Sequence, residues 1–193
     1  MNTLKQLRRR IVTAEEMRAL DEWTINQLGV PTVALMETAG RTVAQHIVDT
    51  YGNERSILVL FGPGNNGADG LVVGRVLTEW GMTVSLRSPL PETALSPLCQ
   101  RQLRTCMKMN MDVALEAAVG IETPTSLVIV DALFGTGLGR APAGMTLAWI
   151  EAINACAAPV VSVDIPSGVC GTSGRVLGMA VQADSTVTFQ CSK

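Results

Sequence analysis

The stretch that most constrains the fold is S-I-L-V-L-F-G-P-G-N-N-G-A-D-G, at residues 56–70. Its first part is an uninterrupted apolar run of the kind that is buried in the centre of a sheet. Its second part holds four glycines, two asparagines and one aspartate, and a helical pattern resumes at once. Glycine lets the backbone adopt positive φ or approach a ligand closely. We therefore interpret this turn as a ligand site, to which Asn65, Asn66 and Asp69 contribute polar groups.

Strand-like and helix-like segments alternate after this turn. Apolar runs predict strands, and periodic patterns predict helices between them. The strands are expected at 57–61, 83–86, 127–133, 159–165 and 185–189, the helices at 70–80, 95–109 and 145–156, and a short helix at 113–119. Such alternation predicts an α/β fold, because parallel strands need right-handed helical crossovers. We expect a three-layer Rossmann-like sandwich, a mostly parallel sheet with helices on both faces, as a single domain over residues 1–193.

Two helices are predicted before the sheet, and residues 1–55 are expected to pack on it as a helical pair. Thr13 and Glu16 form the capping box of the first helix, which ends before Gly29, and the second begins at Pro31 or Thr32. Glu37 in the second helix is either an exposed or capped carboxylate or part of a site.

Composition and charge exclude several functions. A net charge of -2 provides no electrostatic footprint for nucleic acid, and no apolar segment approaches the roughly 20 residues that span a bilayer. Five scattered cysteines without a C-x-x-C pair indicate reduced thiols in a cytoplasmic compartment. The single histidine, His46, lies in a helical pattern, which argues against hydrolases with a Ser-His-Asp or Cys-His mechanism.

Three predicted strands end in unusual sequences: F-G-P-G-N-N-G-A-D-G, D-A-L-F-G-T-G-L-G-R and D-I-P-S-G. In a parallel sheet the carboxyl ends of the strands share one rim, where ligands bind. The first sequence has G-x-G-x-x-G spacing, which favours a dinucleotide. Two features count against the standard dinucleotide site. Asn65, Asn66 and Asp69 lie where a pyrophosphate would contact backbone amides, and the next strand carries Arg87 near its end instead of an acidic residue for a ribose. An ordinary NAD-dependent oxidoreductase is therefore disfavoured.

The rim residues offer two further chemistries. Asn66, Asp131 and Ser167 would supply only oxygen ligands, which suit a hard cation, monovalent or divalent; alternatively, Asp131 caps its own loop. The loop from Gly135 to Gly139, with Arg140 beside it, could accept phosphate. Asp164 is the best candidate for a general acid or base, because partial burial can raise a carboxyl pKa. Asp69 is a second candidate, with a turn-stabilising role as its alternative.

These motifs together resemble the NAD(P)H-hydrate epimerase family, the amino-terminal (YjeF N-terminal) type of domain found in bifunctional NAD(P)H-hydrate repair enzymes. The resemblance covers most of the chain. The matching motifs are L-M-E-T-A-G at 35–40, G-P-G-N-N-G-A-D-G-L-V at 62–72, V-D-A-L-F-G-T-G-L at 130–138, V-D-I-P-S-G at 163–168 and A-D-S-T-V-T-F at 183–189.

The resemblance implies an isomerase that interconverts the R and S epimers of hydrated NADH and NADPH at C6 of the nicotinamide ring, in metabolite repair. It implies a potassium ion held by Asn66, Asp131 and Ser167, and catalysis by Asp164. The substrate-binding residues that it implies are Asn65, Asn66, Gly67, Ala68, Asp69, Gly135, Thr136, Gly137, Leu138, Gly139, Arg140, Ala141 and Asp164.

Partners and departures follow from the same resemblance. It implies a homodimer, and a dehydratase dependent on ADP or ATP, either fused or separate. Ala68 stands where the family usually has glycine, so its β-carbon is expected to crowd the substrate. The chain stops at Lys193, straight after a predicted strand, and we expect a domain truncated at this end. The alternative function is a non-catalytic nucleotide-binding or scaffold module of the same fold.

Overall fold

The computed structural model describes residues 12–121 and 125–189, and it contains one six-stranded sheet in the order β3-β2-β1-β4-β5-β6, with every pair of neighbours parallel. The strands are β1 (Ser56–Phe61), β2 (Thr83–Arg87), β3 (Asp112–Ala114), β4 (Leu127–Ala132), β5 (Val160–Val163) and β6 (Ser185–Val187). The helices are α2 (Ala14–Asn26), α3 (Thr32–Tyr51), α4 (Asn65–Glu79), the short η1 (Glu92–Ala94), α5 (Pro97–Lys108) and α6 (Met145–Ala155).

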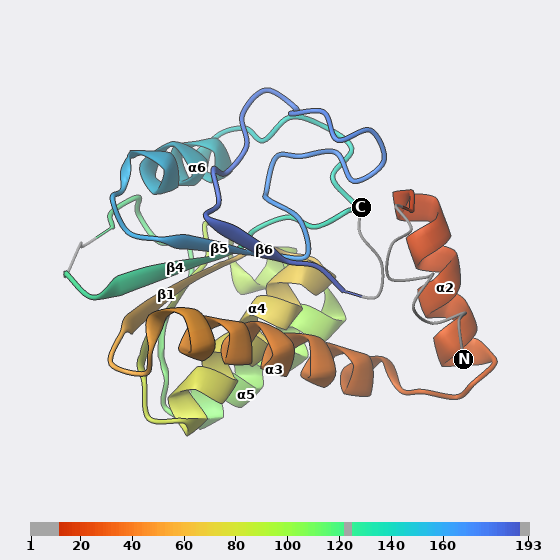
Figure 1. Ribbon diagram of the computed structural model, residues 1–193, viewed down its shortest axis with the longest axis horizontal. Coiled ribbons are helices and arrows are strands. Elements are labelled where there is room, and N and C mark those ends of the chain that lie inside the picture. The colour runs from red at the N-terminus through yellow and green to blue at the C-terminus, as the bar shows by residue number, and fades with distance from the viewer. Residues whose placement is uncertain (1–11, 122–124, 190–193) are drawn as a thin grey trace.

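Helices cover both faces of the sheet, so the predicted three-layer α/β fold is confirmed. Figure 1 shows α3, α4 and α5 on one face and α6 on the other. Strand β1 shows why both faces are covered: Ile57, Val59 and Phe61 belong to the core under α4, and Leu58 and Leu60 belong to the core under α6. Side chains of successive residues in a strand point to opposite faces. A strand that is apolar at every position therefore needs a cover on each side.

Close packing between α3 and α4 depends on a glycine. A Cβ at Gly40 would overlap the side chain of Val72, so the two helices can approach only because Gly40 has none. Helix α2 begins with the predicted capping box, in which Thr13 Oγ1 accepts from Glu16 N at 3.2 Å and Glu16 Oε2 accepts from Thr13 N at 2.8 Å. Figure 1 shows α2 standing apart from the sheet, connected to α3 by a loop.

Two expected elements differ from the structure. The helix expected at residues 113–119 is wrong, because residues 112–114 form the edge strand β3, paired with β2. The helix expected to begin at Gly70 begins at Asn65 instead, so most of the expected flexible turn is helical. Within the described ranges, no helix combines the length and the apolar character that crossing a bilayer requires.

Candidate active site at the sheet rim

The first rim segment is a sharp strand-to-helix turn between β1 and α4. A Cβ at Gly62 would overlap the carbonyl of Leu133, and a Cβ at Gly67 would overlap the carbonyl of Gly62. Only three residues therefore separate the end of β1 from the start of α4, with Gly64 as the N-cap. Residues 65–69 all lie in the first turns of α4, at the rim where β1 ends.

The side chain of Asn66 is the most unusual group at this rim. Asn66 is only 8% exposed, yet neither its Oδ1 nor its Nδ2 has a hydrogen-bond partner among the described residues. Burying an amide without partners costs about 1–3 kcal/mol per unsatisfied group. Such a cost is expected where a ligand completes the hydrogen bonding. Asn66 is therefore placed as a ligand-binding group would be.

The remaining residues of this turn differ in exposure. Asn65 is exposed and Asp69 is half-buried, whereas Gly67 and Ala68 are buried. Ala68 is fully buried inside α4 and belongs to the core packed on the sheet. Its β-carbon therefore packs within the protein, and its effect on substrate binding stays a prediction.

Asp131, in β4, is fully buried and accepts four hydrogen bonds. Its Oδ1 accepts from Ser167 Oγ at 2.5 Å and from Leu133 N at 3.3 Å. Its Oδ2 accepts from Ser162 Oγ at 2.8 Å and from Ser167 N at 2.9 Å. Burial raises the pKa of the Asp131 carboxyl, and the hydrogen bonds from Ser167, Ser162 and Leu133 oppose that rise. Asp131 thus ties the ends of β4 and β5 together.

Ser162 belongs to this cluster, although it was not among the predicted site residues. It lies directly opposite Asp131 in the register between β5 and β4. A serine inside the apolar run V-V-S-V was the available signal, since a polar side chain in a buried strand needs a partner.

The second rim segment, residues 133–141, contacts both of the others. A Cβ built on Gly135 would lie 3.5 Å from Asn66 Oδ1, which places this loop directly against α4. Phe134 N donates to Ser167 Oγ at 2.8 Å, which joins the loop to the segment after β5. Beyond Gly135 the loop opens: Thr136 and Leu138 are half-buried, and the exposed residues are Gly137, Gly139, Arg140 and Ala141.

Asp164 follows β5 directly, and its backbone is unusual. Its φ is +68°, in the left-handed region that L-residues other than Asn, Asp and Gly rarely adopt. Its N–H donates to Val187 O at 2.8 Å, so pairing with β6 fixes this conformation. The side chain is half-buried. A strained backbone of this kind persists where the surroundings enforce it, and it is found preferentially at functional sites.

The structure therefore brings the three predicted segments to one rim. Asn66 lies against Gly135, and Ser167 contacts both Asp131 and Phe134. In the part of the chain that the structure describes, no group of three or more His, Cys, Asp or Glu side chains could hold a metal ion. The polar groups at the rim are amide, hydroxyl and carboxylate groups, whose oxygens suit a hard cation.

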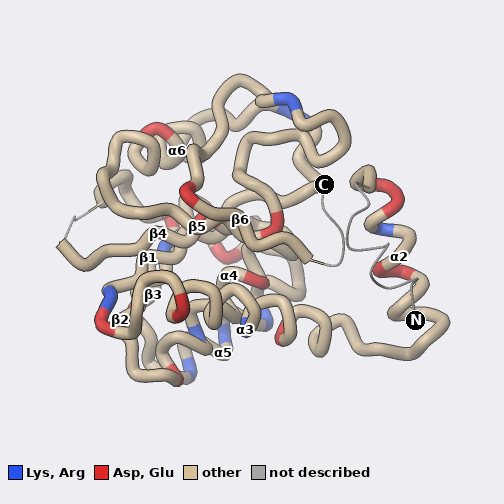
Figure 2. Tube along the Cα trace, viewed as in Figure 1, with Lys and Arg blue, Asp and Glu red and all other residues tan. Residues whose placement is uncertain are grey.

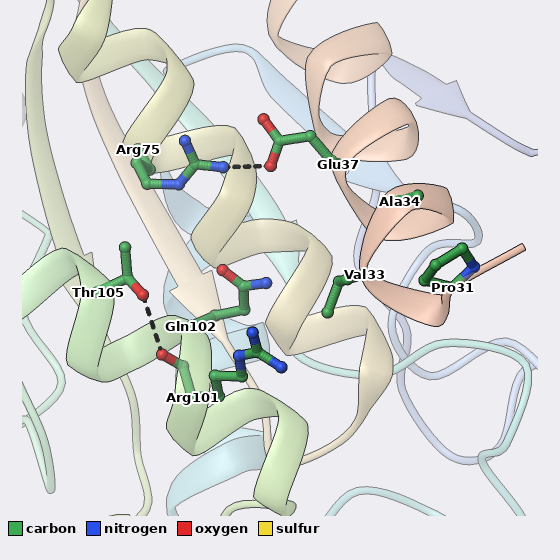
Figure 3. Close-up of a pocket in the computed structure, with 8 residues that line it drawn as sticks. All are labelled: Pro31, Val33, Ala34, Glu37, Arg75, Arg101, Gln102 and Thr105. Atoms are coloured by element: carbon green, nitrogen blue, oxygen red, sulfur yellow. Dashed lines mark hydrogen bonds and ion pairs between the residues drawn. The ribbon is translucent and has the colours of Figure 1, made fainter.

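Glu37 lies elsewhere, in a groove of about 420 Å³ between α3, α4 and α5. Figure 3 shows Arg75 directed at Glu37 across this groove. Glu37 also accepts from Arg41 Nε at 3.0 Å. None of the predicted site residues lines the groove. The carboxylate of Glu37 therefore links α3 to α4 and takes no part in the rim.

Acidic and basic residues are mixed in the part of the chain that the structure describes, as Figure 2 shows. The net charge of -2 likewise gives no electrostatic footprint for nucleic acid.

The chain is similar to known proteins along nearly all of its length. An NAD(P)H-hydrate epimerase of Limosilactobacillus fermentum is 40% identical over 182 residues, which cover 94% of this chain and 86% of that relative. A bifunctional NAD(P)H-hydrate repair enzyme of Thermofilum pendens is 41% identical over 189 residues, and the match covers 95% of this chain but only 36% of that relative.

The fold has a solved counterpart. The crystal structure of the yeast protein ynu0 superimposes with a TM-score of 0.79 at 24% identity, covering 93% of this chain and 79% of that one. A family model described as "YjeF-related protein N-terminus" matches residues 32–193. The match includes all three rim segments, and with the 40% identity along a full-length relative it shows that this chain belongs to the YjeF-related N-terminal domain family.

Proposed function

We propose that this protein is an isomerase, an NAD(P)H-hydrate epimerase that interconverts the R and S forms of hydrated NADH and NADPH. The observation that carries the proposal is the 40% identity to a relative of that name, over 94% of this chain and 86% of the relative. The rim agrees with such a substrate, because it joins a strand-to-helix turn, a glycine-rich loop and a carboxylate at one edge.

Asp164 is the proposed catalytic residue. It gives a proton to the C6 hydroxyl oxygen as the C–O bond breaks, and the electron pair of the ring nitrogen stabilises the cation that results. Water then adds to the other face of the ring and returns a proton to the carboxylate. A half-buried carboxyl group at the end of a strand can donate and accept a proton in this way.

Residues 65–69 and 135–141 are the proposed substrate-binding segments. The loop from Gly137 to Ala141 is largely exposed, and Arg140 adds a positive charge for a phosphate of the dinucleotide. The amide group of Asn66 lies between this loop and α4.

A potassium ion is the proposed cofactor, with Asn66, Asp131 and Ser167 as its ligands. Asn66 Oδ1 fits this role, because it is buried and has no partner among the described residues. Ser167 Oγ donates its hydrogen to Asp131, which leaves its oxygen lone pairs for Phe134 N and for a cation. Asp131 already accepts four hydrogen bonds, so it must release one of them to coordinate directly. When bound, the ion supplies a fixed positive charge beside the substrate.

The test of catalysis is the substitution Asp164→Asn. Asparagine tolerates the left-handed backbone and has the same shape, so the fold is expected to survive. Proton NMR of the C6 position follows a single epimer of hydrated NADH as the second epimer appears. We expect the parent to exceed the buffer rate and Asp164→Asn to lose about 10²-fold or more of that acceleration. Asp112→Asn, at the opposite edge of the sheet, is the matched control and should keep the parent rate.

Two outcomes would contradict these proposals. A parent protein that does not exceed the buffer rate, while still binding the dinucleotide, would favour a non-catalytic binding module. An Asp164→Asn variant with the parent rate would leave the epimerase proposal intact and remove Asp164 from the mechanism.

Partners and compartment are proposed on other observations. Leu20, Trp23 and Leu28 in and after α2 are 39%, 54% and 58% exposed, which supports burial of this surface in a homodimer. Light scattering of the parent and of Trp23→Glu tests this. The bifunctional relatives are much longer than this chain, which supports action alongside a fused or separate dehydratase. The four described cysteines are free thiols, which agrees with the cytoplasm.

A further inference from the structure

The side chain of Asn154, near the end of α6, holds the segment that precedes β6. Its Nδ2 donates to Ala180 O at 2.9 Å, and its Oδ1 accepts from Gln182 N at 2.8 Å. One amide thus satisfies an acceptor and a donor two residues apart, as a neighbouring strand would. Val181, between them, is 4% exposed and packs in the core under α6. Asn154 therefore fixes this segment in position and register.

The segment that Asn154 holds is hydrogen-bonded to the rim. Val181 N donates to Ser167 O at 2.8 Å, and Leu177 N donates to Gly168 O at 2.8 Å. A Cβ built on Gly168 would lie 2.6 Å from Ala180 Cα, so the two stretches of backbone are in direct contact. The hydrogen bonds and the backbone contact with residues 177–182 therefore fix the position of Ser167.

Ser167 in turn positions Asp131 and the start of the glycine-rich loop. Its N and Oγ both donate to Asp131, and its Oγ accepts from Phe134 N, at the start of the glycine-rich loop. The held segment also touches the far end of the loop, because a Cβ built on Gly178 would lie 3.3 Å from Ala141 Cβ. Both ends of this loop therefore contact segments that Asn154 holds in place.

We propose that Asn154 is a positioning residue for this site. Its side-chain hydrogen bonds go to Ala180 and Gln182, neither of which is a proposed catalytic, substrate-binding or metal residue, and through this segment it places Ser167 and residues 135–141 where a substrate and a cation require them. This inference rests on the proposed function. The amide of Asn154 donates to Ala180 O from one atom and accepts from Gln182 N at the other. A carboxylate would put an acceptor against the carbonyl oxygen of Ala180, and leucine would leave both backbone groups unpaired.

The test compares Asn154→Leu and Asn154→Asp with the parent. Hydrogen exchange is measured at the amides of Phe134 and Val181, and the potassium concentration for half-maximal thermal stabilisation is determined. We expect faster exchange at both amides and about a tenfold higher potassium concentration in both variants. In the epimerase assay KM should rise more than kcat falls, because Asn154 does not touch the reacting atoms.

Gln100→Leu is the matched control. Gln100 Nε2 donates to Glu92 O at 3.2 Å and to Leu95 O at 2.9 Å, so it also holds a loop from a helix, and that loop bonds the β1–α4 turn through Ser96 N and Pro63 O rather than Ser167. The control variant should lose stability without changing the exchange at Phe134 or Val181. Asn154 variants that behave like this control would overturn the proposal. If the parent has no epimerase activity, the proposed function fails, and the exchange and potassium measurements still decide the role of Asn154.

Discussion

Replacing Ser167 by alanine tests how the centre of the rim is held together. Ser167 Oγ donates to the buried Asp131 carboxylate at 2.5 Å and accepts from Phe134 N at 2.8 Å. Ser167→Ala removes both bonds and leaves the Phe134 amide without its acceptor. Ser162 Oγ also donates to Asp131, at 2.8 Å, and it is equally buried. Ser162→Ala therefore removes a single bond to the same carboxylate and serves as the matched control.

The two variants should differ in stability by a measurable amount. A hydrogen bond to a charged group contributes about 1.5–3 kcal/mol, and an unsatisfied buried donor costs about 1–3 kcal/mol. Because Phe134 is only partly buried, the lower end applies to its amide. Ser167→Ala should then lose about 3 kcal/mol of the free energy of unfolding, and Ser162→Ala about 2 kcal/mol. For a domain of this length, about 3 kcal/mol lowers Tm by roughly 6–12 °C.

Thermal unfolding in potassium and in choline buffers separates a structural role from a cation ligand. Potassium at a hundred times its Kd should stabilise the parent by about 2.7 kcal/mol. Ser162→Ala should keep most of that increment, whereas Ser167→Ala should lose it, since only Ser167 is a proposed ligand. An equal potassium increment in both variants would refute Ser167 as a ligand. Equal Tm values of the two variants in choline would refute the inference that Ser167 contributes one hydrogen bond more than Ser162.

Three further predictions concern buried groups. Ala68→Gly should lower the free energy of unfolding in urea by about 1–2 kcal/mol, because a fully buried methyl group in a helix is lost; no loss would contradict its core position. Iodoacetamide should label Cys170 before Cys99 and Cys106, as followed by peptide mass spectrometry. Burial raises the pKa of Cys99 to about 12 and that of Cys106 to about 11. A hydrogen bond from a neighbouring serine lowers the pKa of Cys170, so its thiol reacts first. The Tm increment from potassium should grow with pH. Because burial raises the folded-state pKa of Asp131, the carboxyl group stabilises the fold fully below its unfolded pKa of about 3.9, and this contribution is lost as pH rises through the folded pKa, where a bound cation compensates the charge. A potassium increment that stays constant as the pH rises from about 3.9 would contradict this competition.

The architecture could be predicted from the sequence because each strong signal was local. The apolar run at residues 56–61 predicted a strand because buried strands are apolar throughout. The polar sequences after three strands predicted one site because the carboxyl ends of parallel strands share one edge. Asn66, Asp131 and Ser167 were grouped by that rule, and the structure brings the segments that carry them together. Their roles in binding and catalysis stay predictions.

The errors arose where tertiary packing decides local structure. The glycines and polar residues at 62–69 were interpreted as a turn, so the helix was expected to start late, at Gly70. In the structure the glycines of α4 let this helix approach its neighbours: a Cβ at Gly70 would overlap the side chain of Ala132, and one at Gly74 that of Leu86. Strand β3 has only three residues and pairs along one side with β2, which no short window of sequence can show. Asn154 lies in an ordinary helical pattern, and only the fold shows what it holds.

The left-handed backbone at Asp164 has a consequence for how this activity can be lost. At a φ of +68° the tolerated residues are aspartate, asparagine and glycine. In the genetic code, both asparagine and glycine are one nucleotide substitution away from aspartate. A single point mutation can therefore remove the carboxylate without forcing the backbone out of this conformation. If Asp164 has its proposed catalytic role, such a mutation gives an inactive protein that still folds, and asparagine or glycine at this position in a relative would predict a binding protein descended from an enzyme.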